Sequence, residues 1–318
     1  MAAVRKLFMG LVLLIAAWVL AGLAVVAAAG PFTPAGRYVE VDGRRMRLVC
    51  AGPKGSNPIV WMEAGAFGLA ADFAAIQDKL TAKGLRSCAY DRAGMGFSDP
   101  GPKPRDSAAI VADLEKLMAA SGEPGPYILM AHSMAGLHVR LFAARNPDKL
   151  AGLVLIEAAT PQMVGAARAS RFLSRFTTIA RVAAVSGTLG LTKPFYFAGD
   201  RIGLPPQGQK EKRRAYVSGR HARTSASEVL NWRRSSDQAA AAAPFDPRWP
   251  VSVILAGAPR DPSWTTSRRS PELASRAGWY EPVVAASHTT VLGETHGDAA
   301  VRGVAHVLAN LPGADEAR

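Results

Sequence analysis

Cysteine is scarce in this chain of 318 residues, which contains only Cys50 and Cys88. One pair of cysteines is too few for the framework of disulfides that stabilises many small secreted proteins. Histidine is also rare, and none of the six histidines has a spacing from carboxylates that would suggest a metal site. Gly94 and Gly96 lack the third glycine and the helix start of a phosphate-binding loop. We therefore expect neither a metal nor a cofactor.

Acidic residues are fewer than basic ones, 25 against 38, which gives a net charge of +13. Most of the excess lies in residues 161–247, where 14 Lys and Arg face 5 Asp and Glu. The basic residues form two clusters there: Lys210, Lys212, Arg213 and Arg214, and then Arg233 and Arg234. They follow no motif of nucleic-acid recognition, so we expect no nucleic-acid partner. They fit a solvated helical surface, or a face that contacts anionic lipid head groups or steers anionic substrates.

Charged residues are absent from Leu7 to Ala29, and Arg5 and Lys6 precede this apolar run. As a helix with a rise of ~1.5 Å per residue, the run is long enough to span a bilayer core. Ala27 to Ala29 supply small residues for a signal peptidase, but signal-peptide cores usually have only about 7–15 residues. We favour an uncleaved anchor over residues 1–30, with the domain that follows on the extracytoplasmic, periplasmic side.

Ser133 follows an apolar run, Tyr127 to Ala131, and precedes a helix-like segment, Leu137 to Arg145. Ala131 and Ala135 flank the serine, and small residues permit a tight turn. On such a strand-to-helix turn the hydroxyl projects from the sheet edge, and the first helical amide faces the oxyanion formed on attack. The pattern predicts a nucleophilic serine.

The chain resembles the α/β-hydrolase superfamily at this turn, where the family has Gly-x-Ser-x-Gly. Three further segments agree in order: residues 61–68, the Asp-Arg-x-Gly-x-Gly-x-Ser sequence at 91–98, and Ser287-His288. The resemblance implies an α/β-hydrolase fold, a mostly parallel eight-stranded sheet flanked by helices with a helical cap insertion. This chain departs from the pattern at Ala131 and Ala135. The methyl group of Ala135 is expected to crowd the helix against the sheet, with Gly136 taking up some of the strain.

Apolar strand-like runs alternate with helical stretches such as Ser107 to Ser121, which favours a parallel sheet covered on both faces. The runs are Ile59 to Glu63, Ser87 to Tyr90, Tyr127 to Ala131, Leu153 to Glu157, Val251 to Ala256 and Glu281 to Ala286. No strand pattern interrupts the long stretch between the fourth and fifth of these runs. We predict one catalytic domain, residues 31–160 and 248–318, with a helical cap at residues 161–247.

The resemblance supplies partners for Ser133. His288 lies where the family has its catalytic histidine, whereas His132 and His138 are expected to be packing or surface residues. The orienting acid is either Asp261, after the run Val251 to Ala256, or Glu157, at the end of an earlier run. Both positions meet at the carboxyl edge of the sheet, and we favour Asp261.

The same resemblance places the oxyanion hole at the amides of Met134 and of Ala66 or Phe67. Family topology makes the segments of Cys50 and Cys88 neighbouring strands, so the two cysteines form either a disulfide or two buried thiols.

A serine nucleophile with a histidine base and a carboxylate predicts hydrolysis of carboxylic esters, with a small acyl ester as substrate. It argues against the epoxide hydrolases and haloalkane dehalogenases that share this scaffold, because they use aspartate at the same turn. Two other readings stay open. One is a cofactor-free perhydrolase or acyltransferase on the same triad, and the other is an inactive, membrane-anchored binding protein.

Overall fold

The computed structural model describes residues 1–163, 167–258 and 262–311. Its strands form one sheet of eight in the order β1-β2-β4-β3-β5-β6-β7-β8. Their bounds are β1 Arg37–Val41, β2 Arg44–Ala51, β3 Ile59–Glu63, β4 Ser87–Tyr90, β5 Tyr127–His132, β6 Leu150–Ile156, β7 Val251–Ala256 and β8 Gly278–Val283. From β4 to β8 the neighbouring strands are parallel, and β2 pairs antiparallel with β1 and β4. The predicted α/β-hydrolase fold is thereby confirmed.

The helices are bounded as α1 Ala2–Ala28, α2 Ala74–Ala82, α3 Ser107–Ala120, α4 Ala135–Arg145, α5 Ala167–Thr188, α6 Pro206–Tyr216, α7 Gly219–Leu230, α8 Trp232–Ala241, α9 Pro262–Ala274 and α10 Asp298–Ala309. Short 3₁₀ segments are η1 Ala70–Phe73, η2 Pro147–Lys149, η3 Pro161–Met163, η4 Lys193–Gly199 and η5 Thr290–Leu292.

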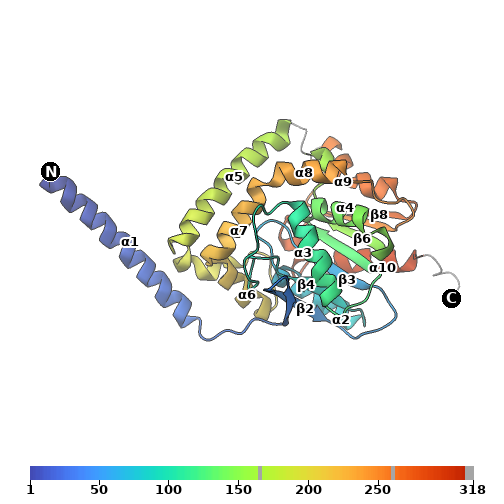
Figure 1. Cartoon of the computed structure of the whole chain (residues 1–318), viewed down its shortest axis with the longest axis horizontal. Helices are drawn as coiled ribbons and strands as arrows, with labels where there is room; N and C mark the ends of the chain where they lie inside the picture. The colour runs from blue at the N-terminus through green and yellow to red at the C-terminus, as the bar shows by residue number, and fades with distance from the viewer. Residues whose placement is uncertain (164–166, 259–261, 312–318) are drawn as a thin grey trace.

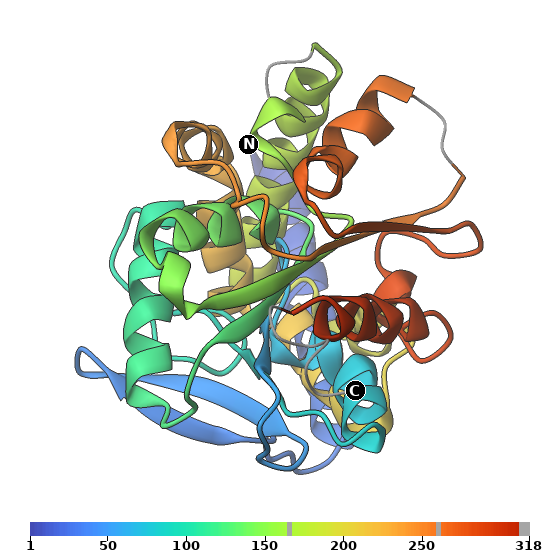
Figure 2. The same ribbon diagram turned by 90° about the vertical axis from the view of Figure 1, so that its right-hand side faces the viewer.

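Alternate residues of the central strands feed two separate cores because side chains of a strand point to opposite faces. On β5, Leu129 packs in the core with α3 and α4, and Ile128 and Met130 pack in the core with α2 and α10. Figure 2 shows α10 (red) beside α2 (cyan), and α3 and α4 (green) on the opposite side of the sheet. Burial on both faces explains why these strands are continuous apolar runs.

Two predicted strands differ from expectation by three residues at an end: β6 begins at Leu150 instead of Leu153, and the last strand is displaced at both ends. The last strand, β8, covers Gly278–Val283 instead of residues 281–286. It pairs with β7 from Val251↔Gly278 to Ala256↔Val283, so β8 ends where its partner ends. Residues 284–286 then turn toward the His288 loop.

Cys50 and Cys88 are joined in a disulfide. The two residues are direct partners in the antiparallel pairing of β2 with β4. The bond therefore ties the β1–β2 edge to the parallel part of the sheet. Of the two alternatives that the sequence left open, the disulfide is the one observed.

Between β6 and β7 the chain leaves the sheet and forms α5, η4, α6, α7 and α8, with α5 packed along α7 (Figure 1). We call residues 161–247 the cap, the limits proposed from the sequence. The α1 helix projects from the body as a long rod and contacts the cap at η4 (Figure 1). At ~1.5 Å per residue, its 27 residues extend about 40 Å, more than a hydrocarbon core of ~30 Å.

Candidate active site

Ser133 occupies the sharp turn between β5 and α4 with a φ of 56°, in the left-handed region that residues with a side chain rarely adopt. Its amide donates to the Ile156 carbonyl at 3.2 Å, which fixes the turn against the next strand. A Cβ on Gly136 would lie 2.3 Å from the Ala159 carbonyl oxygen. The glycine that close packing requires is therefore at 136, and the fully buried Ala135 is tolerated.

His288 lies between a hydroxyl and a carboxylate. Its Nε2 is 3.0 Å from Ser133 Oγ, and its Nδ1 is 2.9 Å from Glu157 Oε2. Because a carboxylate only accepts, Nδ1 carries the proton and Nε2 is left to accept from the serine. This brings together two of the residues expected from the sequence, with the less favoured acid as the third. Asp261 lies outside the described residues.

Glu157 comes directly after β6 with a φ of 50°, which turns its side chain across the sheet edge toward His288. Its other oxygen, Oε1, accepts from Arg268 Nη1 and from the Ala256 amide, both at 2.9 Å. Burial alone would raise the pKa of Glu157. The hydrogen bond from His288 and the charge of Arg268 outweigh burial and hold the pKa at about 2. Glu157 is therefore ionised at neutral pH.

Arg268, on α9, was not expected from the sequence. It lies 111 residues beyond Glu157, and nothing in a helix of mixed composition marks it as a partner of a strand-end carboxylate. Its side chain is largely buried and stacks over the Trp264 ring at 5.3 Å. Only the tertiary fold shows that Arg268 orients the Glu157 carboxylate and favours its ionised form.

Three backbone amides are the expected donors to the oxyanion. Among the described residues, none accepts a hydrogen bond from the backbone N–H of Met134, Ala66 or Phe67. Met134 directly follows the serine and is the N-cap of α4, where the helix dipole favours a negative charge. A Cβ on Gly65 would lie 2.8 Å from Ser133 Cβ, so glycine keeps the space beside the serine open.

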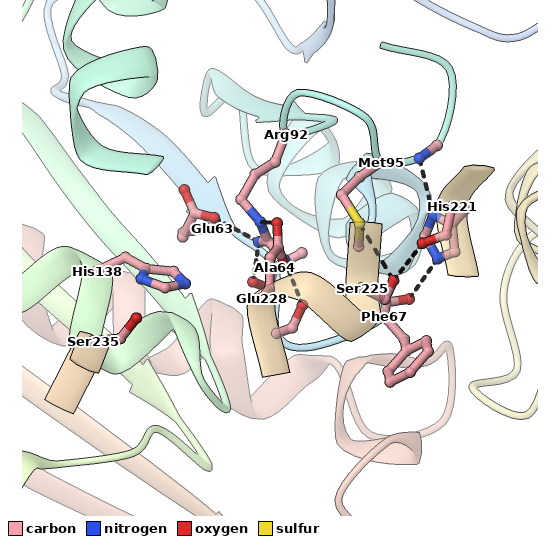
Figure 3. Close-up of polar contacts among 12 residues, drawn as sticks. Glu63, Ala64, Phe67, Arg92, Met95, His138, His221, Ser225, Glu228 and Ser235 are labelled. Carbon is pink, nitrogen blue, oxygen red and sulfur yellow. Dashed lines mark hydrogen bonds and ion pairs between the residues drawn. The ribbon is translucent and has the colours of Figure 1, made fainter. Parts of the chain in front are cut away.

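Buried charges hold the loop of Ala66 and Phe67 in place (Figure 3). Arg92 donates to the carbonyls of Ala64 and Gly65, to Glu63 at 2.7 Å and to Glu228 of α7 at 2.7 Å. One guanidinium thereby connects β3, the loop of Ala66 and Phe67, and the cap. It is buried, and its bonds join these three parts of the chain, so its role is structural.

A second cation, Lys212 of α6, secures the same loop. Its Nζ donates to the Phe67 carbonyl at 3.0 Å and to the buried carboxylate of Asp72 at 2.8 Å. The sequence grouped Lys212 with Lys210 as part of a surface cluster. In the fold it points inward, whereas Lys210 is exposed.

His221 of the cap contacts this loop as well (Figure 3). Its Nδ1 accepts from the Gly96 amide at 2.9 Å, which leaves Nε2 to donate to the Phe67 carbonyl at 3.3 Å. Burial lowers the pKa of His221 to about 3, with the charge of Lys212 adding to the effect. The neutral imidazole of His221 thus helps to hold the loop of Ala66 and Phe67 in position.

His132 precedes the serine and is buried at 7% exposure, which agrees with packing, but it also touches the site. Its Nε2 donates to the backbone carbonyl of His288 at 2.9 Å, and the two rings lie 4.7 Å apart. Burial and the charge of His288 lower its pKa to about 3. A neutral His132 thus anchors the loop that carries His288.

Metal-binding geometry in the described residues is limited to Cys50, Cys88 and Glu123. The two sulfurs are joined in the disulfide and offer no thiolate, and Glu123 is paired with Arg86 at 2.7 Å. The cluster is therefore accounted for by structural bonds.

Comparison with known proteins agrees with the fold. A family model described as the alpha/beta hydrolase fold matches residues 58–257, more than half of the chain. The chain therefore belongs to this family of the alpha/beta hydrolase fold.

Individual relatives are distant. The uncharacterised protein C23C11.06c of Schizosaccharomyces pombe is 28% identical over 230 residues, which cover 70% of this chain and 41% of that protein. YbdG of Bacillus subtilis, also uncharacterised, is 29% identical over 128 residues, 40% of this chain and 39% of that protein. The matched part thus spans about two fifths of these curated relatives.

A solved structure of a mutant epoxide hydrolase from Bacillus megaterium superposes with a TM-score of 0.62 at 14% identity. The superposition covers 85% of this chain and 100% of that one. At this identity the likeness concerns the fold alone.

Proposed function

We propose that this protein is a serine hydrolase that cleaves carboxylic esters through an acyl-enzyme on Ser133. The observation that carries the proposal is the chain of two hydrogen bonds, Ser133 Oγ to His288 Nε2 and His288 Nδ1 to Glu157. We assign Glu157 as the orienting acid on this geometry, although the sequence favoured Asp261. Met134 and either Ala66 or Phe67 supply the oxyanion donors.

The reaction follows from these positions. Ser133 Oγ bonds to the ester carbonyl carbon while His288 Nε2 takes the hydroxyl proton, and the oxyanion is held by the amides of these donors. The bond from the carbonyl carbon to the alcohol oxygen breaks, and His288 returns the proton to the departing alcohol. Water then attacks the acyl-enzyme with His288 again as base, releasing the acid and restoring Ser133. Each oxyanion donor is worth about 3–4 kcal/mol of transition-state stabilisation in enzymes of this kind.

Epoxide hydrolysis is less well supported, although the solved neighbour carries that name. Opening an epoxide by covalent catalysis on this scaffold needs a carboxylate nucleophile, and the residue at the turn is a serine. The serine, with its histidine and carboxylate, is an arrangement for acyl transfer.

A fluorophosphonate probe tests the nucleophile, with a series of p-nitrophenyl esters of graded chain length as substrates. The wild type and the control Ser227→Ala, on α7 of the cap, are expected to be labelled and to release nitrophenol, whereas Ser133→Ala does neither. Labelling that persists in Ser133→Ala would falsify the assignment. Absence of labelling in the wild type favours a binding protein on an inactive scaffold. If products with added alcohol or peroxide exceed the free acid, the enzyme is an acyltransferase or a perhydrolase.

We further propose that α1 remains attached as an anchor and that the catalytic domain lies on the extracytoplasmic side. The support is the pair Arg5 and Lys6 before the apolar helix, because positive charge is retained in the cytoplasm. Protease protection in spheroplasts distinguishes the two sides.

A further inference from the structure

A cavity of about 1430 Å³ connects the catalytic residues to the N-terminal helix. One end is lined by Ser133 and His288, and the other by Leu14, Ile15 and Trp18 of α1. Small-molecule sites usually enclose about 300–1,000 Å³, so this space is larger than a short ester requires. A helix that only targets the chain to a membrane has no need to line a catalytic cavity.

One wall of the cavity between these two ends is apolar, whereas polar side chains such as Lys212, Tyr216 and His221 line other parts of it. The apolar wall is formed by one face of α5, and its members are Phe172, Leu173, Phe176, Ile179, Val182 and Ala183, with Ser186 at the α1 end. Apart from that serine, this stretch offers a ligand no hydrogen-bonding side chain. It therefore suits a long hydrocarbon chain whose polar end lies at Ser133.

The contact between α1 and the cap is specific. Trp18 Nε1 donates to the Leu191 carbonyl at 3.0 Å, and its ring lies 5.7 Å from that of Phe195. Gly22 is buried, and a Cβ there would lie 2.6 Å from Pro194 Cδ. Glycine is needed for this close approach, which indicates that α1 is fitted to the cap.

Apolar side chains continue from this contact onto the outside of the cap. Ile179, Val182 and Phe195 line the cavity and are more than half exposed, so the cavity is open on this side. Val185, Leu189 and Phe197, which do not line it, are 59%, 58% and 59% exposed. Soluble surfaces rarely gather so many large apolar side chains. Trp18 lies about 15 Å along the helix axis from the end of α1, which is inside a hydrocarbon core of ~30 Å. With α1 spanning the bilayer as proposed above, the exposed face adjoining it lies at the depth of acyl chains.

Polar and basic groups mark the end of α1 where it leaves the membrane. Arg214 of α6 donates to the carbonyl of Gly30, directly after the helix, and lies over the ring of Phe32 at 5.7 Å. Lys210 is exposed on the same short helix. Basic side chains at this level favour anionic head groups.

We propose that the substrate is a lipid ester resident in the bilayer, whose long acyl chain enters between α1 and α5 and lies along α5 with its carbonyl at Ser133. This rests on the ester hydrolysis proposed above. The bilayer covers the exposed face of α5 and η4, and α1 forms one wall of the entrance. The substrate then moves from lipid to the serine without crossing water.

Two esters with one leaving group test this: 4-methylumbelliferyl oleate dissolved in phosphatidylcholine vesicles that hold the full-length protein, and the water-soluble acetate. The measured quantity is the ratio of kcat/KM for oleate to that for acetate. Ala183→Trp places an indole in the passage and should lower the ratio about tenfold or more, the scale on which pocket shape discriminates substrates. Thr178→Trp, exposed on the same helix and outside the cavity, should leave the ratio within about twofold.

A second pair probes the α1 wall. Gly22→Leu forces α1 away from η4 and should lower the same ratio, whereas Gly10→Leu, which has no neighbouring atom within 4 Å, should not. Thermal unfolding of each variant checks that it is folded, and the Gly22 pair keeps the test decisive if Ala183→Trp does not fold.

The outcomes separate the two proposals. A wild type that hydrolyses neither ester and resists fluorophosphonate overturns the proposed function. A wild type that hydrolyses the acetate but not the oleate, or ratios equal to wild type in both Ala183→Trp and Gly22→Leu, overturns the lipid route and leaves ester hydrolysis standing.

Discussion

His288 donates from Nδ1 to the Glu157 carboxylate over 2.9 Å, although 131 residues separate the two along the chain. The bond selects the tautomer whose Nε2 can accept the Ser133 proton. Because Arg268 and the Ala256 amide hold the other carboxylate oxygen, the acid has little freedom to rotate away. Orientation of the base therefore depends on a single side chain supported from two other elements.

Replacing Glu157 with glutamine should lower kcat strongly. The amide nitrogen can donate to Nδ1, which favours the tautomer with its proton on Nε2, and loss of the orienting carboxylate typically costs about 10⁴-fold in kcat. The measurement is kcat on a p-nitrophenyl ester, with fluorophosphonate labelling to report on the Ser133 environment.

Asp261→Asn is the matched comparison, because Asp261 is the other acid that the sequence offers. We expect it to keep kcat within a few-fold of wild type. If Asp261→Asn instead lowers kcat strongly and Glu157→Gln leaves it nearly unchanged, Asp261 is the orienting acid and the assignment to Glu157 is wrong.

Lys212 should matter for stability in a way that its neighbour Lys210 does not. Lys212→Met leaves the buried Asp72 carboxylate without its cation, and breaking a buried pair in this way costs about 3–5 kcal/mol. Lys210→Met changes an exposed residue and should stay within about 0.5 kcal/mol of wild type. Urea unfolding in detergent measures both.

A further substitution, Asp72→Asn, made on the Lys212→Met background should recover part of the lost stability. If Lys212→Met is as stable as Lys210→Met, the pair with Asp72 contributes nothing and Lys212 belongs with the surface cluster after all.

The sheet was predictable because strands that are buried on both faces are uninterrupted apolar runs in the sequence. The runs Ile59–Glu63 and Val251–Ala256 match β3 and β7 at both ends. The last strand was misplaced because its bounds come from pairing with β7, and register between strands leaves little trace in one strand's own composition.

The site was predictable where its chemistry depends on local sequence, and not where it depends on packing. The residues next to Ser133 predict its turn, and a histidine that follows the last strand indicates a catalytic base in this family. The acid was not decided, because Glu157 and Asp261 both follow strands that end at the same sheet edge. Arg268 and the cavity wall formed by α1 come from contacts between distant segments, which the order of residues does not reveal.

Buried histidines should make stability depend on pH. Burial lowers the pKa of His132 and His221 to about 3, and that of His138 well below its usual value. The unfolded chain binds a proton on each histidine below about pH 6.5, and the folded chain does not until far lower pH. Above pH 6.5 these histidines are neutral in both states and their titration does not change stability, whereas below it the unfolded chain gains protons and the folded state loses stability as the pH falls.

His221→Gln isolates one of these contributions. Each such histidine adds up to about 1.4 kcal/mol per pH unit to the slope of unfolding free energy below pH 6.5. The variant should be less stable than wild type at pH 7.5, because the contacts to the Gly96 amide and the Phe67 carbonyl are weakened. Its slope should be smaller than that of wild type by about half of this limit at pH 6.5 and by nearly all of it at pH 5, so the two stability curves converge in acid. Urea unfolding at four or five pH values measures the difference in unfolding free energy between wild type and variant. The carboxylates are the same in both proteins, so their titration cancels in this difference. Parallel curves would mean that His221 takes up its proton at about the same pH in the folded protein as in the unfolded chain, which would contradict a lowered pKa and a buried imidazole in the folded state.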